Sequence, residues 1–408
     1  MKNGIAKPFL KWAGGKTQLI TEIERSLPYE ITNKKFTYIE PFVGSGAILF
    51  WMLENFPKLE KAVINDINAD LINTYRIIAS KPKELISILQ ILQNEFHNLE
   101  GKEEEKKEYY YKKRELYNTR KEEQSGQAAL FIFLNRTCFN GLYRVNKSNG
   151  YNVPMGSYKK PTICDDKNIL AVSTVLQKAE ILCGDYEATL KEATSNSFFY
   201  FDPPYKPLSN TSSFNSYAKD KFNDEEQIRL RNFCSKLEKQ GHKWMLSNSD
   251  VKGKDTNDNF FDDIYSEFSI SRVKARRSIN ANPEKRGELT ELLINNYIKR
   301  DYIPAISLNK EDLFVKNYDK QYWTIQNKFD INNIKIDKNR FSFINDISEI
   351  MVNRIISNFD LTFWIPITVD KEFYLLDGQH RLAAAKSMNL KYIDIVVQDT
   401  ELLNEKTL

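Results

Sequence analysis

An aromatic run that stops at two prolines constrains the fold of this chain more than any other stretch. Residues Phe198 to Tyr205 read Phe-Phe-Tyr-Phe-Asp-Pro-Pro-Tyr. Four consecutive aromatic residues favour a strand covered on both faces, as strands of parallel sheets are. Neither proline can donate a backbone hydrogen bond, so the strand must end there. The sequence therefore predicts an open α/β sheet with Asp202 at its carboxyl edge, where such folds bind ligands.

The turn after this strand combines hydrogen-bond acceptors with a ring. Pro203 and Pro204 fix the backbone, so that the Asp202 carboxylate, a carbonyl oxygen and the Tyr205 ring are aimed at one point. Such a set can accept two hydrogen bonds from a planar amino group and stack on its ring. The alternative is a strand-ending turn with a capping Asp202, and these residues alone leave both interpretations open.

The length of the chain predicts two domains. Its 408 residues exceed one ordinary hydrophobic core, and the hydrophobic fraction of 41% favours globular folding. We place the domains at residues 1–300 and 301–408. The sequence has no apolar run of membrane-spanning length and no signal-peptide core, which predicts a cytoplasmic protein without a membrane partner. The four cysteines form no Cys-x-x-Cys pair, which argues against a metal site and a disulfide framework.

A glycine-containing turn between a strand and a helix predicts a nucleotide-binding unit. The strand Phe36 to Ile39 is followed by Glu40-Pro-Phe-Val-Gly-Ser-Gly46 and an apolar helix. Leu49 stands where a dinucleotide fingerprint needs its third glycine, which favours a different adenosine-containing cofactor. The next strand ends at Asp66, where ribose hydroxyls are usually held. The alternative is that Asp66 caps the helix that starts near Ala69.

Two further segments carry candidate binding residues. Phe9 to Lys16 resembles a truncated phosphate loop, but Leu10 replaces the first glycine, which disfavours a nucleoside triphosphatase. Trp12 is either a stacking surface or core.

Asn135 to Lys160 interleaves arginines, amides, aromatics and lysines, a composition typical of surfaces that read base edges and hold phosphates. A loop packed on the sheet would leave its basic residues unexplained. The mixed-charge run Lys102 to Glu123 predicts a solvated helix face.

The order of these motifs resembles that of the Dam-type adenine-N6 DNA methyltransferases of the alpha group, from about Lys7 to Tyr297. The resemblance implies a Rossmann-like methyltransferase sheet with a mainly helical target-recognition insertion at about 69–165. It implies transfer of a methyl group from S-adenosylmethionine to N6 of adenine in double-stranded DNA. The adenine would be flipped out of the duplex, and transfer would be direct and in line, without a metal. The net charge of +4, with its basic surplus before residue 300, agrees with a DNA partner.

The resemblance also implies a role for individual residues. The catalytic residues would be Asp202, Pro203, Pro204 and Tyr205. The cofactor would be bound by Trp12, Ala13, Gly14, Gly15, Lys16, Glu40, Phe42, Gly44, Gly46, Asp66, Asp185 and Asp202. GATC-methylating members keep their DNA-binding residues at positions that correspond to Lys11, Phe139, Asn140, Leu142, Arg144, Pro154 and Tyr158. Phe139 would be the wedge that fills the gap left by the flipped base, where members usually carry tyrosine.

The C-terminal part lies outside this resemblance. The segment Phe373 to Lys386 predicts a strand, a turn at Gly378 and an alanine-rich helix, and a strand returns at Tyr392 to Val397. Residues 331–398 are similar to the ParB/sulfiredoxin-like domain, a smaller α+β fold whose Gly-x-x-Arg turn contacts nucleotide phosphates. The similarity implies a phosphate-binding set and a nucleotide triphosphate ligand, the set being Gly378, Gln379, His380 and Arg381. The alternative is a capped helix with a partly exposed histidine.

Two other functions compete with the methyltransferase interpretation. In one, the protein is a DNA-binding regulator whose ParB-like domain carries the function, and the methyltransferase fold is a scaffold. The intact Asp202, Tyr205 and Lys16 favour the enzyme instead. In the other, the same turn methylates RNA or a protein amide. The composition of the segment from Asn140 to Tyr158 argues against this second function. Restriction-modification, replication and repair marking, and protection of mobile DNA are all consistent with the chain.

Overall fold

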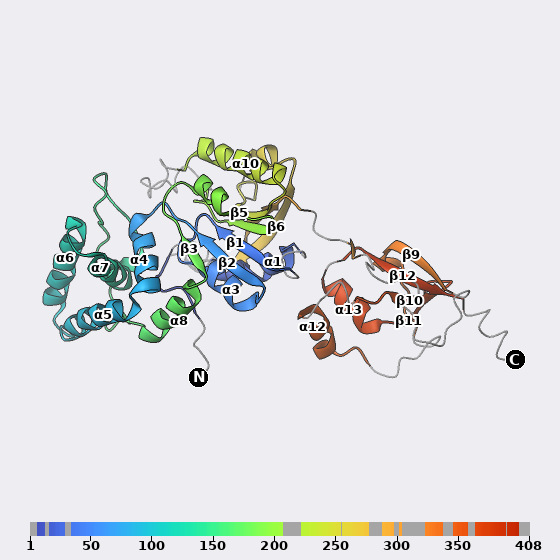
Figure 1. Ribbon diagram of the computed structural model, residues 1–408, viewed down its shortest axis with the longest axis horizontal. Coiled ribbons are helices and arrows are strands. Elements are labelled where there is room, and N and C mark those ends of the chain that lie inside the picture. The colour runs from blue at the N-terminus through green and yellow to red at the C-terminus, as the bar shows by residue number, and fades with distance from the viewer. Residues whose placement is uncertain are drawn as a thin grey trace. The chain divides into compact units, whose positions relative to one another are not determined.

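The computed structural model describes residues 6–12, 16–28, 34–206, 222–253, 255–276, 288–297, 302–303, 323–337, 346–357, 364–388 and 390–399. The chain forms two compact units, Met1–Tyr297 and Ile298–Leu408. Figure 1 shows the elements of both, and each unit is described by itself.

The first unit is built on a seven-stranded sheet in the order β3-β2-β1-β4-β5-β7-β6. Its strands are β1 (Phe36–Glu40), β2 (Leu59–Ile64), β3 (Ala179–Ile181), β4 (Ser197–Phe201), β5 (Lys243–Ser249), β6 (Ser269–Arg276) and β7 (Glu288–Asn295). Strands β1 to β5 are parallel to one another, whereas β7 is antiparallel to both β5 and β6. The direction in which the strand order grows reverses between β1 and β4, and open α/β sheets bind ligands at such a switch point. The predicted α/β sheet is confirmed, with this antiparallel strand added.

Strand β4 is buried on both faces, as its four aromatic residues predict. Phe198 and Tyr200 belong to one hydrophobic cluster, whereas Phe199 and Phe201 belong to the other. All four side chains are fully buried. Because successive side chains of a strand point to opposite faces, an aromatic run of this kind can only be accommodated between two layers of helices.

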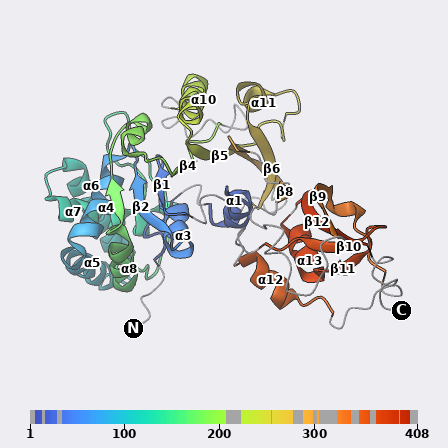
Figure 2. The same cartoon turned by 45° about the vertical axis from the view of Figure 1, so that its right-hand side comes forward.

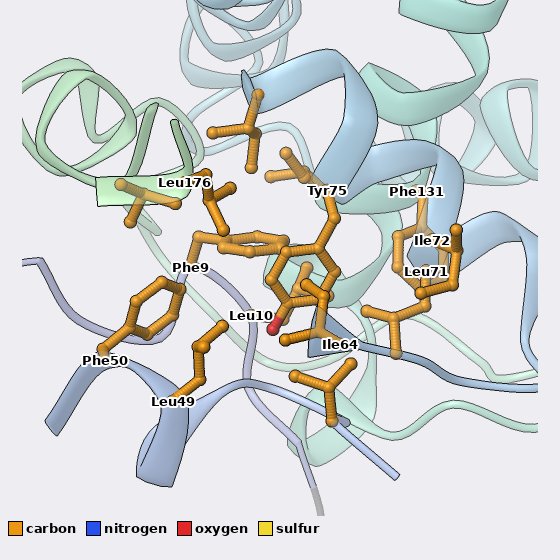
Figure 3. Packing of buried hydrophobic residues seen from close by; sticks show 14 of the residues in the cluster. Phe9, Leu10, Leu49, Phe50, Ile64, Leu71, Ile72, Tyr75, Phe131 and Leu176 are labelled. Carbon is orange, nitrogen blue, oxygen red and sulfur yellow. The ribbon is translucent and has the colours of Figure 1, made fainter. Parts of the chain in front are cut away.

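The two layers of helices cover opposite faces of the sheet. The first face is covered by η1 (Lys16–Leu19), α1 (Ile20–Ser26), α3 (Ala47–Asn55), α4 (Ala69–Ser80) and α8 (Asp166–Leu176). Figure 3 shows side chains of this layer converging, with Phe9 and Tyr75 side by side above Leu49 and Phe50. The second face is covered by η3 (Tyr186–Glu192), α10 (Asp224–Lys239) and α11 (Phe260–Ile264).

Three more helices form an array at one side of the sheet, next to α4 and α8 (Figure 1). They are α5 (Pro82–His97), α6 (Glu103–Thr119) and α7 (Gln124–Thr137), and the short turn η2 (Phe139–Gly141) follows. Helix α7 is buried along almost its whole length. Helix α6 differs from the solvated helix that its mixed charge predicts, because Lys106, Tyr110 and Tyr117 are buried. Its other charges lie on the remaining positions, so the helix keeps one face for packing.

The second unit is a five-stranded sheet with helices, shown in Figure 2. Its elements are β8 (Tyr302–Ile303), β9 (Trp323–Asp330), η7 (Ile331–Asn333), α12 (Glu349–Ser357), β10 (Ile367–Asp370), β11 (Leu375–Asp377), α13 (Gln379–Ser387) and β12 (Tyr392–Gln398). The predicted strand, turn, helix and returning strand are present from β11 to β12, and Gly378 has φ +99° at the turn. Helix α13 packs against β10 and α12.

Two observations concern other predictions from composition. No helix in the described part of the chain is long and apolar enough to cross a membrane. All four cysteines are free, and within the ranges given above no three His, Cys, Asp or Glu side chains are grouped as a metal site would require.

Candidate active site

Three acidic side chains meet at the carboxyl edge of neighbouring parallel strands. Glu40 ends β1, Asp66 follows β2 and Asp202 follows β4. Burial raises the pKa of Glu40 well above its usual value and also raises that of Asp66. Burial raises the pKa of Asp202 to about 6, although the nearby ammonium of Lys16 acts in the opposite direction. Carboxyl groups with raised pKa values in a sheet crevice are typical of functional sites.

Asp202 and Tyr205 are brought together around Lys16. The Lys16 Nζ atom lies 3.2 Å from Asp202 Oδ1 and 3.8 Å from the centroid of the Tyr205 ring. It also contacts the Tyr205 hydroxyl. On the other side, Ser247 Oγ donates a hydrogen bond of 3.0 Å to Asp202 Oδ1. The carboxylate and ring predicted to be catalytic and the lysine predicted to bind the cofactor therefore form one site.

Glu291 is a member of this site that the sequence reasoning missed. Its Oε2 atom accepts a hydrogen bond of 2.7 Å from the Tyr205 hydroxyl and lies 3.4 Å from Lys16 Nζ. Glu291 lies in β7, the antiparallel strand between β5 and β6. A single acid within the apolar run from Leu289 to Ile294 is the only signal that could have indicated it.

The backbone of the turn is held by buried amides. Gln227 Nε2 donates to the Pro204 carbonyl at 3.1 Å, and Asn248 Nδ2 donates to Gln227 Oε1 at 3.1 Å. Asn248 Oδ1 in turn accepts from the backbone N–H of Lys206. Within the described ranges, no hydrogen-bond donor reaches the Pro203 carbonyl oxygen.

The glycine turn between β1 and α3 is packed so tightly that it excludes side chains. Gly44 and Gly46 have φ values of +48° and +76°. A Cβ atom at Gly46 would lie 2.6 Å from the Tyr75 hydroxyl and 2.9 Å from the Phe50 ring. The Tyr75 hydroxyl of α4 donates a hydrogen bond of 3.0 Å to the Gly44 carbonyl, and this bond holds the turn in place.

The Asp66 carboxylate faces this turn. It accepts hydrogen bonds from the backbone N–H groups of Gly44, at 3.2 Å, and of Asn68, at 2.9 Å. The N-cap of α4 is Asn68, whose side chain accepts from two backbone N–H groups of the first turn. The alternative that Asp66 caps α4 is therefore wrong. Its neighbour Ile67 is 77% exposed, an apolar surface beside the acid that the sequence analysis did not identify.

The other predicted cofactor-binding residues have different surroundings. The Trp12 ring lies beside Gly44, within 3.3 Å of a Cβ atom built there. Phe42 packs among aromatic side chains of the second face, including Tyr186. Asp185 caps η3 and pairs with Arg229 at 2.8 Å, so its carboxylate already has two protein partners. Ala13, Gly14 and Gly15 lie outside the described residues.

Lys11 and Tyr158, which stands near the end of the recognition segment, are brought together. The Lys11 ammonium lies 4.0 Å from the centroid of the Tyr158 ring. The buried Asn135 positions Lys11, because it accepts from the Lys11 N–H at 2.8 Å and donates to the Lys11 carbonyl at 2.7 Å. The same Asn135 amide donates to the Gly141 carbonyl. This positioning role was not predicted.

The remaining recognition residues lie on an exposed turn and hairpin. The backbone N–H of Phe139 donates to the Pro154 carbonyl at 2.9 Å, and Arg144 Nε donates to Asn152 Oδ1 at 2.7 Å. Phe139 is 50% exposed and Leu142 is 38% exposed. Asn140 has φ +54°, so the turn bends sharply just after Phe139. The predicted DNA-binding side chains thus share one surface region.

Helix α6 supports this region from inside. The ammonium of Lys106, which is 1% exposed, donates to the carbonyls of Tyr158 and Lys159 at 3.2 Å and 2.8 Å. The Tyr110 hydroxyl donates to the Val153 carbonyl at 2.8 Å. The charged run to which the sequence analysis assigned no chemistry therefore holds the recognition segment in place.

In the second unit, the side chains of the predicted phosphate-binding set are engaged with protein groups. The Arg381 guanidinium donates to the carbonyls of Ile365 and Pro366 and to Asp377, and burial lowers its pKa. His380 Nε2 accepts a hydrogen bond of 3.0 Å from the Ser348 N–H. Gly378 precedes the first residue of α13, Gln379. Gly378 makes no side-chain cap hydrogen bond at the start of α13, so these contacts do not bear out the capped-helix alternative, and phosphate binding stays a prediction.

Comparison with known proteins agrees with this geometry. The D12 class N6 adenine-specific DNA methyltransferase family matches residues 12–279. The type II methyltransferase M.MjaIII of Methanocaldococcus jannaschii is 49% identical over 293 residues, which cover 71% of this chain and 99% of that protein. The type II methyltransferase M1.LlaDCHI of Lactococcus lactis is 38% identical, covering 71% and 95%. The DNA adenine methylase of Escherichia coli is 33% identical, covering 70% and 94%. The predicted enzyme class is confirmed, and the chain belongs to the family of D12 class N6 adenine-specific DNA methyltransferases.

Proposed function

We propose that the protein transfers the methyl group of S-adenosylmethionine to N6 of an adenine that it has flipped out of duplex DNA, within the sequence GATC. One observation carries the proposal. At the switch point of the sheet, the Asp202 carboxylate, the Pro203 carbonyl and the Tyr205 ring follow β4, and a turn of positive-φ glycines that faces Asp66 follows the neighbouring parallel strand β1. This combination suits an adenine amino group next to an adenosine-containing methyl donor.

The residues present fit S-adenosylmethionine. The Gly44 to Gly46 turn leaves no space for a Cβ atom at Gly46, so backbone lines the site there. Asp66 would bind the ribose hydroxyls, because its carboxylate stands at the end of β2. Trp12 and the exposed Ile67 would contact the apolar part of the donor, and Lys16 its carboxylate. When bound, the donor supplies an electrophilic methyl group on its sulfonium.

The residues of the turn would orient the target amino group. Asp202 and the Pro203 carbonyl would each accept one of its hydrogen bonds, which directs the nitrogen lone pair out of the plane of the base. Tyr205 would stack on the adenine ring. Lys16 now lies against both Asp202 and the Tyr205 ring, so its ammonium must move aside when the base enters. Catalysis would then come chiefly from positioning.

Base flipping follows from the position of the acceptors. The adenine amino nitrogen cannot reach a crevice in the sheet while it stays in the base stack. Phe139, half exposed on a turn that bends sharply at Asn140, is suited to fill the gap. Its backbone is fixed by the Pro154 carbonyl, which would hold the ring in place as the base leaves.

The GATC specificity rests on the exposed hairpin and on Lys11. Arg144 would read a guanine through two hydrogen bonds. Its Nε atom already donates a hydrogen bond to Asn152 Oδ1, which holds the guanidinium in place. Lys11 and Tyr158 lie together, so one base or phosphate would meet both. Leu142 would contact the target sequence through its exposed apolar side chain.

Labelled methyl transfer to short duplexes tests this proposal. We expect transfer to a GATC duplex, weaker transfer when any one of its bases is changed, and none with Asp202→Ala. Arg144→Ala should lose about 1–3 kcal/mol of discrimination at one base pair. Transfer that ignored the GATC context would overturn the specificity and leave the enzyme class intact.

For the C-terminal unit we propose a ParB/sulfiredoxin-like fold that binds a nucleotide at the Gly378 turn. The β11 strand, the left-handed Gly378 and helix α13 support it, as does the parallel pairing of β10 with β12. Titration of the full chain with nucleoside triphosphates should show binding that Gly378→Ala weakens. If no nucleotide binds, a structural or partner-docking role remains for this unit.

A further inference from the structure

Tyr143 joins the two binding regions of the first unit. Its ring is stacked on Trp12, with centroids 5.6 Å apart and an angle of 22° between the planes. Trp12 lies beside Gly44 in the proposed methyl-donor site. Tyr143 itself stands between Leu142 and Arg144 in the exposed hairpin. One residue therefore contacts the wall of the donor site and belongs to the segment proposed to read DNA.

The rest of the Tyr143 side chain is fixed by packing. The ring meets Phe131 of α7 edge to face, at 5.6 Å, and Tyr151 from the second arm of the hairpin, at 5.9 Å. Burial raises the pKa of the Tyr143 hydroxyl to about 12, with the charge of Asp70 acting in the same direction and the side chain of Asn68 against it. The hydroxyl therefore lies close to the start of α4.

This end of α4 belongs to the donor site as well. The backbone N–H of Asn68 donates to Asp66 Oδ1 at 2.9 Å, so the loop that would bind ribose is built on the same residue. Asp70 is paired with Arg120 at the end of α6. Tyr143 thus touches the donor site through its ring, which is stacked on Trp12.

We propose that Tyr143 is a positioning residue that couples methyl-donor binding to target reading, an inference that rests on the proposed function. A donor that fixes Trp12 also fixes the Tyr143 ring stacked on it, which anchors the hairpin, so Arg144 is already ordered when it meets the DNA. Linkage requires the converse, because DNA that orders the hairpin must raise donor affinity by the same factor. Coupling factors between two sites are commonly about 5- to 150-fold.

A purely structural role for Tyr143 predicts a different result. Loss of packing would lower stability and weaken DNA or donor binding each by itself, without changing the factor by which one ligand helps the other. Loss of coupling would leave each ligand's affinity for the free protein nearly unchanged and abolish their mutual enhancement. The ratio of affinities is therefore the quantity to measure.

The experiment uses the full chain, a GATC duplex and S-adenosylhomocysteine, the product form of the donor, which allows no turnover. Dissociation constants are measured for each ligand with and without the other, for wild type, Tyr143→Phe and Tyr143→Ala. We expect a factor of about 10 in both directions for wild type and for Tyr143→Phe, which keeps the stacked ring, and a factor near one for Tyr143→Ala.

Several outcomes would overturn the inference. The inference is wrong if Tyr143→Ala shows the same factor of mutual enhancement as the wild type. It is also wrong if the wild-type protein binds both ligands without mutual enhancement, a result that leaves the proposed function intact. A wild type that binds neither ligand would instead contradict the proposed function. Tyr143→Leu, which keeps an apolar side chain but no ring, replaces the alanine variant if that does not fold, and the same two outcomes are read from it.

Discussion

The hydroxyl of Tyr205 donates a hydrogen bond to Oε2 of Glu291, 2.7 Å away, and so ties the turn from Asp202 to Tyr205 to strand β7. Lys16 lies within 3.4 Å of the same oxygen and within 3.2 Å of Asp202 Oδ1. One ammonium is therefore shared by two carboxylates that come from different strands. The arrangement fixes the plane of the Tyr205 ring, and it also sets the charge that surrounds Asp202.

Replacing Glu291 with glutamine should slow methyl transfer while leaving the fold intact. The substitution keeps the shape of the side chain but removes the charge that holds Tyr205 and Lys16. A charge-assisted hydrogen bond of this kind contributes about 1.5–3 kcal/mol, which corresponds to about 13- to 160-fold in kcat. Single-turnover rates at saturating donor and DNA measure it. Glu238→Gln, on the exposed face of α10, is the matched control, and equal rates for both variants would contradict a role for Glu291.

The rate should depend on pH through Asp202. Burial raises its pKa to about 6, with Lys16 and Ser247 lowering it and Glu291 raising it. Below that pH the group carries a proton and loses an acceptor for the adenine amino group, so kcat should fall about tenfold per pH unit below 6. Glu291→Gln should move this fall to lower pH, because it removes a nearby negative charge. A profile that stays flat down to pH 5 would show that ionised Asp202 is not required.

Substitution of Gly46 should reveal how tightly the glycine turn is packed. Alanine there combines a left-handed backbone with a Cβ atom 2.6 Å from the Tyr75 hydroxyl. Gly101→Ala is the control, because Gly101 has φ +82° but no atom within 4 Å of its added Cβ. We expect a loss of about 1 kcal/mol for Gly101→Ala and of about 2–4 kcal/mol for Gly46→Ala, from urea unfolding. Equal losses would mean that Tyr75 and Phe50 move aside.

Replacing Lys106 with methionine should weaken DNA binding and spare donor binding. Methionine fills the same buried space but leaves the Tyr158 and Lys159 carbonyls without their donor, at a cost of about 1–3 kcal/mol. Titrations with a GATC duplex and with S-adenosylhomocysteine separate the two effects. Lys102→Met changes a lysine that is 57% exposed just before the same helix and should change neither titration.

The parts of the fold that could be predicted are those coded by adjacent residues. The aromatic run gives β4 and its burial on both faces, because alternation along a strand is a local property. The glycine turn and the Gly378 turn were identifiable because each requires a positive φ that few other residues adopt. The turn from Asp202 to Tyr205 could be placed for a similarly local reason, since two prolines end a strand wherever it lies.

The sequence could not indicate partners that meet only after the sheet has formed. Glu291 is 275 positions from Lys16, and Asn135 is 124 positions from Lys11. Lys106 looked like one more solvated charge in a mixed run, because its burial depends on α7 and on the recognition segment that packs beside it. Asp66 was ambiguous for a related reason. Only the position of Asn68 shows which of the two residues caps α4.

The sequence by itself determined which chemical groups this protein brings to its site: a carboxylate, a proline-fixed carbonyl and a ring at the end of a buried strand. Short-range sterics decide these, and they act within a few residues. The tertiary structure decided how these groups are charged and held. Lys16 joins Asp202 to Glu291 only because β7 inserts between β5 and β6, and Tyr143 meets Trp12 only because the hairpin folds back on the glycine turn.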